Sequence, residues 1–132
     1  FVGCSLGGFW SLAFQHIFGH PIVAINPTIN PSETLKKYLN STGLVQSFDG
    51  TETYNLTQDI IDEYKKYEVY DNNTAKTIII SKDDEILNPL DAINALKDKA
   101  KLMTFDDGGH SGYKHINAII EEISLTLNRN TM

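Results

Sequence analysis

The sequence has 132 residues, of which 41% are hydrophobic and 21% are charged, as in an ordinary globular domain with a sizeable core. A formal net charge of −6 argues against nucleic acid or an anionic membrane surface as a partner, because either would favour a basic face. The single cysteine excludes an internal disulfide and is compatible with a cytoplasmic location, and no apolar run approaches the ~18 residues of a membrane helix.

The pattern G-x-S-x-G stands near the first residue and is formed by Gly3, Ser5 and Gly7. A short apolar run precedes it, and apolar residues at helical spacing follow it as far as Gly19. The pattern therefore predicts a strand, a sharp turn with Ser5 at its apex, and a helix that is buried on most sides and ends at Gly19. Both flanking glycines are expected where strand and helix approach too closely for a Cβ atom. The alternative is an ordinary glycine-rich turn that contains a serine.

A strand that carries such a serine normally lies inside a sheet, so we expect further strands N-terminal to Phe1 that this sequence lacks. The sequence is accordingly interpreted as the C-terminal portion of a longer protein. Cys4 belongs to the strand before the turn and is expected to pack there rather than to react.

Strand-like and helix-like segments alternate along the rest of the chain. We expect strands over residues 22–25, 77–80 and 101–105 and helices over residues 33–39, 58–67, 89–99 and 113–128. Residues 40–56 show no clear periodicity and are expected to form an irregular loop. The alternation predicts an α/β domain over residues 1–132 with a mainly parallel sheet and helices on both faces. Residues 27–74 are longer than a minimal crossover and are predicted to form a cap or lid within that domain.

Three residue types needed for nucleophilic catalysis follow one another along the chain. Ser5 comes first, an acidic run follows the strand over 77–80, and His110 lies in a loop after the last strand. The order Ser, Asp, His is the chain order of α/β-hydrolases. The imidazole must accept the serine proton, and a carboxylate on its other nitrogen selects the tautomer. We predict Ser5 as nucleophile, His110 as base and Asp84 as acid, with Asp83 left as the alternative acid.

One donor of the oxyanion hole is predicted to be the backbone N–H of Leu6, the residue after the nucleophile. The second donor should come from a loop after an early strand, outside this chain. The other histidines and the acids nearest to His110 are expected to be structural, packed or exposed to solvent: His16, His20, His115, Asp106 and Asp107.

Several motifs resemble those of the YqiA/YcfP-like esterases of the α/β-hydrolase superfamily. They are the residues 2–8, 25–27, 31–35, 54–57, 84–87 and 108–111, which together span nearly the whole chain. The resemblance implies a small α/β-hydrolase with Ser5 as nucleophile, Asp84 as acid and His110 as base. It also implies that a preceding segment holds a His-Gly oxyanion motif.

The predicted function is a serine esterase that cleaves carboxylic esters through an acyl-enzyme, with no metal or organic cofactor. The partner would be a small-molecule acyl ester or thioester, and the sequence does not indicate an oligomeric state. Two alternatives stay open: an acyl thioesterase with the same triad, and a non-catalytic binding module with an α/β-hydrolase-like fold.

Overall fold

The computed structural model describes the chain except for residues 40–43, 48, 71–75 and 132. It contains two compact units. The first comprises Phe1–Ile29 and Val69–Met132, and the second comprises Asn30–Glu68.

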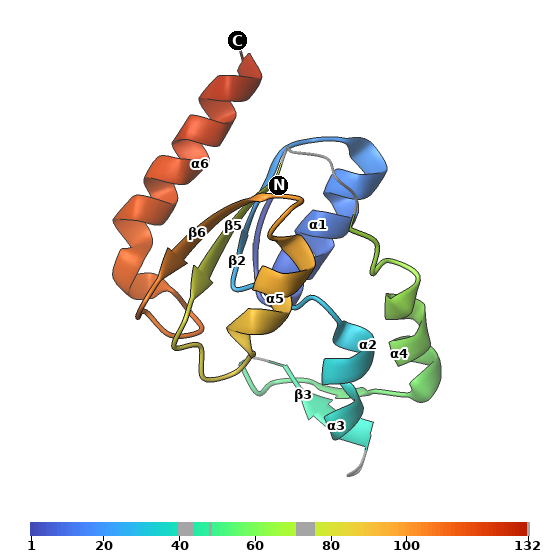
Figure 1. The fold of residues 1–132 in the computed structure, drawn as a ribbon. Coiled ribbons are helices and arrows are strands. Elements are labelled where there is room, and N and C mark those ends of the chain that lie inside the picture. The colour runs from blue at the N-terminus through green and yellow to red at the C-terminus, as the bar shows by residue number, and fades with distance from the viewer. Residues whose placement is uncertain (40–43, 48, 71–75, 132) are drawn as a thin grey trace. The chain divides into compact units, whose positions relative to one another are not determined.

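The first unit is built on a four-stranded parallel sheet in the order β1-β2-β5-β6 (Figure 1). The short strand β1 precedes the sharp turn at Ser5, which we call the elbow, and the three strands expected further along the chain all form. Their bounds are Val2–Cys4 for β1, Ile22–Ile25 for β2, Lys76–Ser81 for β5 and Lys101–Phe105 for β6. Ile25 lies opposite Cys4 on one side and Ile79 on the other. Because all strands run the same way, the loops that follow them meet at one edge of the sheet.

Helices cover both faces of this sheet, as the sequence predicted (Figure 1). α1 (Leu6–Phe18) and α5 (Pro89–Leu96) pack on one face, and α6 (Ile116–Thr131), which follows a 3₁₀ turn at Tyr113–His115, packs on the other. Alternate strand residues point to opposite faces. The two resulting apolar clusters are centred on Leu12, Ala24, Ile78 and Leu96, and on Val23, Ile25, Ile79 and Ile119.

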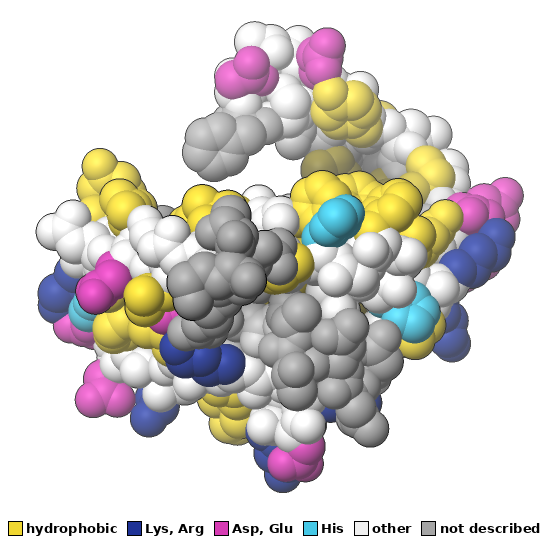
Figure 2. Space-filling model, turned by 90° about the horizontal axis from the view of Figure 1, so that it is seen from above, with side chains coloured by type: hydrophobic (Ala, Val, Ile, Leu, Met, Phe, Trp, Pro, Cys, Tyr) yellow, Lys and Arg dark blue, Asp and Glu magenta, His cyan; other side chains and the backbone are white. Residues whose placement is uncertain are grey.

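The helix α1 ends where the sequence predicted. Gly19 has φ 73°, and its N–H donates to the carbonyl of Gln15 at 2.8 Å. The expectation that this helix is buried on most sides is wrong, because Phe14, Ile17 and Phe18 are exposed. Exposed hydrophobic side chains also run across the face seen from above in Figure 2, with a histidine among them.

The second unit combines short helices with a β-hairpin. The helix expected over 33–39 is two short helices, α2 (Pro31–Thr34) and α3 (Lys36–Leu39). The irregular loop expected over 40–56 instead contains the antiparallel strands β3 (Leu44–Gln46) and β4 (Thr53–Asn55), and residues 40–43 and 48 lie outside the described part. α4 (Gln58–Lys65) begins as predicted after Thr57, whose Oγ1 accepts a hydrogen bond from the N–H of Ile60.

Candidate active site

Ser5 occupies the turn between β1 and α1 in a backbone conformation that L-residues rarely adopt. Its φ is 55° and its ψ is −121°. The N–H of Ser5 donates to the carbonyl of Ile25 at 3.0 Å, and the Ser5 carbonyl accepts from Thr28 at 2.9 Å and from Phe9 at 3.2 Å. Such a conformation costs about 1–3 kcal/mol and persists only where the surroundings enforce it. The predicted strand, turn and helix are confirmed, with Ser5 at the apex.

The glycines around the serine do not all have the same role. A Cβ atom on Gly3 would lie 2.1 Å from the carbonyl oxygen of Gly7, so a side chain at position 3 is incompatible with this turn. At Gly7 itself a Cβ atom would meet nothing within 4 Å, so the expected steric requirement there is wrong. The second close approach is at Gly8, where a Cβ atom would lie 2.8 Å from the Cβ of Pro27.

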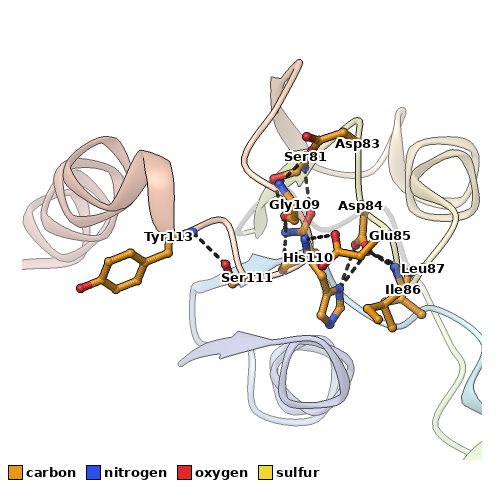
Figure 3. Close-up of polar contacts among 11 residues, drawn as sticks. Ser81, Asp83, Asp84, Glu85, Ile86, Leu87, Gly109, His110, Ser111 and Tyr113 are labelled. Carbon is orange, nitrogen blue, oxygen red and sulfur yellow. Dashed lines mark hydrogen bonds and ion pairs between the residues drawn. The ribbon is translucent and has the colours of Figure 1, made fainter.

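His110 and Asp84 form a hydrogen-bonded pair at the edge of the sheet where the strands end (Figure 3). The Nδ1 atom of His110 lies 2.9 Å from Oδ2 and 3.1 Å from Oδ1 of Asp84. The Asp84 side chain is only 2% exposed, and its Oδ1 also accepts from the N–H groups of Ile86 (2.8 Å) and Leu87 (2.9 Å). The carboxylate is therefore held in place from several sides, and a neutral His110 bonded to it carries its proton on Nδ1.

The acids on either side of Asp84 hold the backbone of the histidine loop. Asp83 Oδ1 accepts from the N–H of Gly109 at 2.8 Å, and Glu85 Oε2 accepts from the N–H of His110 at 2.9 Å (Figure 3). Of the two aspartates that the sequence left open, Asp84 is thus the one that contacts the imidazole. The role of Glu85 was not predicted, although it belongs to the same acidic run.

Ser5 and His110 come from opposite ends of the chain, and each is hydrogen-bonded to one of two consecutive residues at the end of β2. Ser5 N–H bonds to Ile25 O, and the side chain of Asn26 bonds to the carbonyl of His110 at 2.7 Å. Between Ser5 and His110 themselves, no hydrogen bond is found in the described part of the chain. Catalytic hydrogen bonds are often long without substrate. Leu6 begins α1, so its N–H points out of the first helical turn without an acceptor in the helix.

The other candidate side chains have structural contacts. Asp107 is exposed to solvent over 48% of its side chain, in line with the expectation, but it also pairs with Lys114 and with His115 Nε2 (2.7 Å), and these hydrogen bonds lower the pKa of its carboxyl. His115 packs as predicted, with its ring stacked on Phe105 at 4.0 Å. Asp106 is 95% exposed.

Cys4 does not pack as expected. The residue is exposed, although partial burial of its thiol raises the pKa and so disfavours the reactive thiolate. His16 and His20 are exposed.

Within the described residues, no group of three or more His, Cys, Asp or Glu side chains is arranged to hold a metal ion. None of the helices in the same part of the chain has the length and apolar composition to cross a membrane.

Residues 1–126 match the model of a family described as Uncharacterised protein family (UPF0227). The chain belongs to this family. The match extends over the motifs from which the family resemblance was drawn, and it confirms that resemblance. Among proteins with curated descriptions, none matches this chain significantly.

Solved structures with the same fold are α/β-hydrolases and esterases. Alpha/beta hydrolase domain-containing protein 10 from mouse superposes with a TM-score of 0.66 at 14% identity, over 97% of this chain and 61% of that one. Est1E from Butyrivibrio proteoclasticus superposes with a TM-score of 0.65 at 16% identity, over 99% of this chain and 60% of that one. The esterase domain of a Rhodothermus marinus protein superposes with a TM-score of 0.57 at 17% identity, over 83% of this chain and 51% of that one. The fold is therefore that of an α/β-hydrolase, as predicted, and the chain spans less than two thirds of the length of these structures.

Proposed function

We propose that the protein is a serine hydrolase that cleaves carboxylic esters through an acyl-enzyme intermediate. The observation that carries the proposal is the Asp84–His110 pair, whose carboxylate is only 2% exposed, together with a serine held at φ 55° in the turn after β1. An ordinary glycine-rich turn has no reason to hold its serine at φ 55°, and the same unit also contains a carboxylate-bound imidazole. Membership of the family and the α/β-hydrolase fold support the same function.

In the acylation step, Ser5 Oγ attacks the ester carbonyl while His110 Nε2 takes the hydroxyl proton. Asp84 holds Nδ1 protonated, which leaves Nε2 as the basic nitrogen, and it stabilises the imidazolium that forms. The N–H of Leu6 donates to the oxyanion of the tetrahedral intermediate. Collapse of this intermediate breaks the C–O bond, and His110 returns the proton to the departing alcohol.

In the deacylation step, water attacks the acyl group on Ser5, and His110 again takes and returns a proton. The products are the carboxylic acid and free Ser5. A second oxyanion donor from outside this chain belongs to the proposal, because loss of one donor lowers the rate by about 10²–10³.

We also propose that the second unit is the part that selects the acyl group. It begins at Asn30, five residues after the last residue of β2, and β2 ends at the same edge of the sheet as the strands that precede Ser5, Asp84 and His110. Long inserts between a strand and the next crossover commonly cover an active site.

The proposal is tested by labelling the full-length protein with a fluorophosphonate and mapping the modified residue. We expect modification of Ser5, abolished in Ser5→Ala and His110→Gln and retained in Ser124→Ala, a matched change on the exposed surface of α6. Turnover of p-nitrophenyl esters should follow the same pattern. Labelling elsewhere, or unchanged turnover in Ser5→Ala, would exclude the mechanism.

The substrate class is decided with a panel of oxygen esters and acyl thioesters. One solved structure is Est1E with ferulic acid bound, so a feruloyl ester belongs in the panel. Turnover that favours thioesters would identify a thioesterase with the same triad. A folded protein without labelling at Ser5 would identify a non-catalytic module.

A further inference from the structure

Asn26 is a buried residue at the end of β2 with an unusual backbone conformation. Its φ is 43°, and it is only 3% exposed. Its N–H donates to the carbonyl of Ile79 at 2.8 Å, so its backbone still takes part in the pairing of β2 with β5. Asparagine tolerates the left-handed region better than other residues with a side chain, because its short amide can form local hydrogen bonds. A buried polar side chain in a strained position indicates a specific task.

The side-chain amide of Asn26 connects β5 with the histidine loop. Its Oδ1 accepts from the N–H of Ser81 at 2.8 Å, and its Nδ2 donates to the carbonyls of His110 (2.7 Å) and Gly109 (3.2 Å). The orientation of the amide is determined by these partners, because a backbone N–H can only donate and a carbonyl can only accept. Ser81 Oγ lies at 3.5 Å from Nδ2.

The backbone of Gly109 and His110 is consequently held through both of its N–H groups and both of its carbonyls. Asp83 and Glu85 accept from its two N–H groups, and Asn26 donates to its two carbonyls. With the backbone so restrained, the imidazole has only its side-chain torsions left, and the bond to Asp84 restricts those.

We propose that Asn26 is a positioning residue that keeps the His110 imidazole against Asp84. This inference rests on the proposed function for its catalytic meaning, but the geometric claim stands by itself. The alternative is that Asn26 serves only the stability of the sheet, through its contacts with Ser81 and Ile79.

Two substitutions separate these roles. Asn26→Asp has nearly the same shape and keeps an oxygen for the N–H of Ser81, but its second oxygen cannot donate when ionised and faces two carbonyls. Asn26→Gly removes the amide and keeps a residue that adopts a positive φ without strain. Ile78→Val, a small change in a fully buried core position away from the site, serves as the control for loss of stability alone.

The first measurement is the ¹⁵N spectrum of the histidine rings in the full-length protein at alkaline pH, with His110 assigned by comparison with His110→Gln. We expect the wild type and Ile78→Val to show His110 as the Nδ1–H tautomer. In Asn26→Asp and Asn26→Gly we expect a mixture of tautomers, as in a mobile imidazole. An unchanged single tautomer in both variants would overturn the proposal, whatever their melting temperatures.

The second measurement is the kinetics of ester hydrolysis. We expect kcat to fall by about 10- to 100-fold in both Asn26 variants with KM changed little, since a misplaced base affects the chemical step. Ile78→Val should retain kcat. Wild-type kcat in the Asn26 variants would contradict the positioning role. If the wild type itself proves inactive, the proposed function fails, and the ring spectrum alone still decides whether Asn26 positions His110.

Discussion

At the scale of single residues, the elbow depends on a contact that only glycine allows. Gly3 and Gly7 both flank Ser5 in the G-x-S-x-G pattern, yet only Gly3 faces an obstacle, because a Cβ atom there would lie 2.1 Å from the carbonyl oxygen of Gly7. The pattern in the sequence treats the two positions alike, and the structure distinguishes them.

This difference predicts opposite effects of the same substitution. Gly3→Ala should lower the free energy of unfolding by at least about 1–3 kcal/mol, because backbone must move to admit the methyl group. Gly7→Ala should be neutral or stabilise α1 by up to about 1 kcal/mol, since Gly7 lies in the helix and Ala is the better helix former. Urea unfolding of both variants measures the two effects. Equal destabilisation by the two would contradict this account of the turn.

The sequence pointed to the proposed catalytic residues more readily than to the residue that we propose holds one of them in place. Ser5, Asp84 and His110 were predicted from residue type and order, and Asp84 and His110 indeed form a pair. Asn26 escaped prediction, because its contacts reach Ser81 and His110, 55 and 84 positions away, and no local pattern encodes them.

At the scale of elements, segments with a clear period were predicted well, and short exposed ones were not. β5 forms close to the expected bounds because its run of β-branched residues makes a buried strand recognisable, and β6, which is only partly buried, was marked by its three apolar residues. The hairpin of β3 and β4 was missed. Each of its strands has three residues, Leu44 and Tyr54 are exposed and Val45 is only partly buried, so the strands are too short and too little buried to leave a pattern in the sequence.

The turn of this hairpin depends on one carboxylate. Asp49 Oδ1 accepts hydrogen bonds from Ser47 Oγ (2.7 Å), Thr51 N (3.0 Å) and Thr51 Oγ1 (2.7 Å). These bonds favour the charged form and lower the pKa of Asp49 to about 2. Because the pKa in the folded state lies below the ordinary value of about 3.9, the bonds stabilise the turn fully above that value. The stabilisation is lost as the pH falls toward 2.

The chemical shift of the Thr51 amide proton measures this titration. We expect a midpoint near 2 in the wild type and no titration at this amide in Asp49→Asn. A midpoint close to 4 would mean that the hydrogen bonds to Asp49 do not form in solution.

At the scale of the whole molecule, the chain separates its structural core from its insert. Both apolar clusters of the sheet consist of residues from the first unit only. The second unit has its own internal contacts, among them the hydrogen bond from the Ser32 N–H to Glu68 Oε1 at 2.8 Å. Sequence length between strands indicated an insert over 27–74, whereas the boundaries of the compact unit depend on contacts that no composition shift reveals.

This separation predicts that the first unit can keep its fold when residues Asn30–Glu68 are replaced by a short Gly-Ser linker. The hydroxyl of Tyr70 donates to the carbonyl of Ile29, so the two ends to be joined already lie close together. The protein with this replacement should unfold cooperatively and still hydrolyse p-nitrophenyl acetate, because Ser5, Asp84 and His110 all remain. Because we propose that the insert selects the acyl group, its removal should change the preference between long and short acyl chains by at least about 10-fold.

The control is the same replacement combined with Ser5→Ala. This variant should have no activity, which would show that the turnover of the shortened protein depends on Ser5. A shortened protein with an unaltered acyl preference would show that the insert does not select the substrate. Selection would then belong to the sheet edge itself, where the loops after β1, β5 and β6 carry the three predicted catalytic residues within one unit.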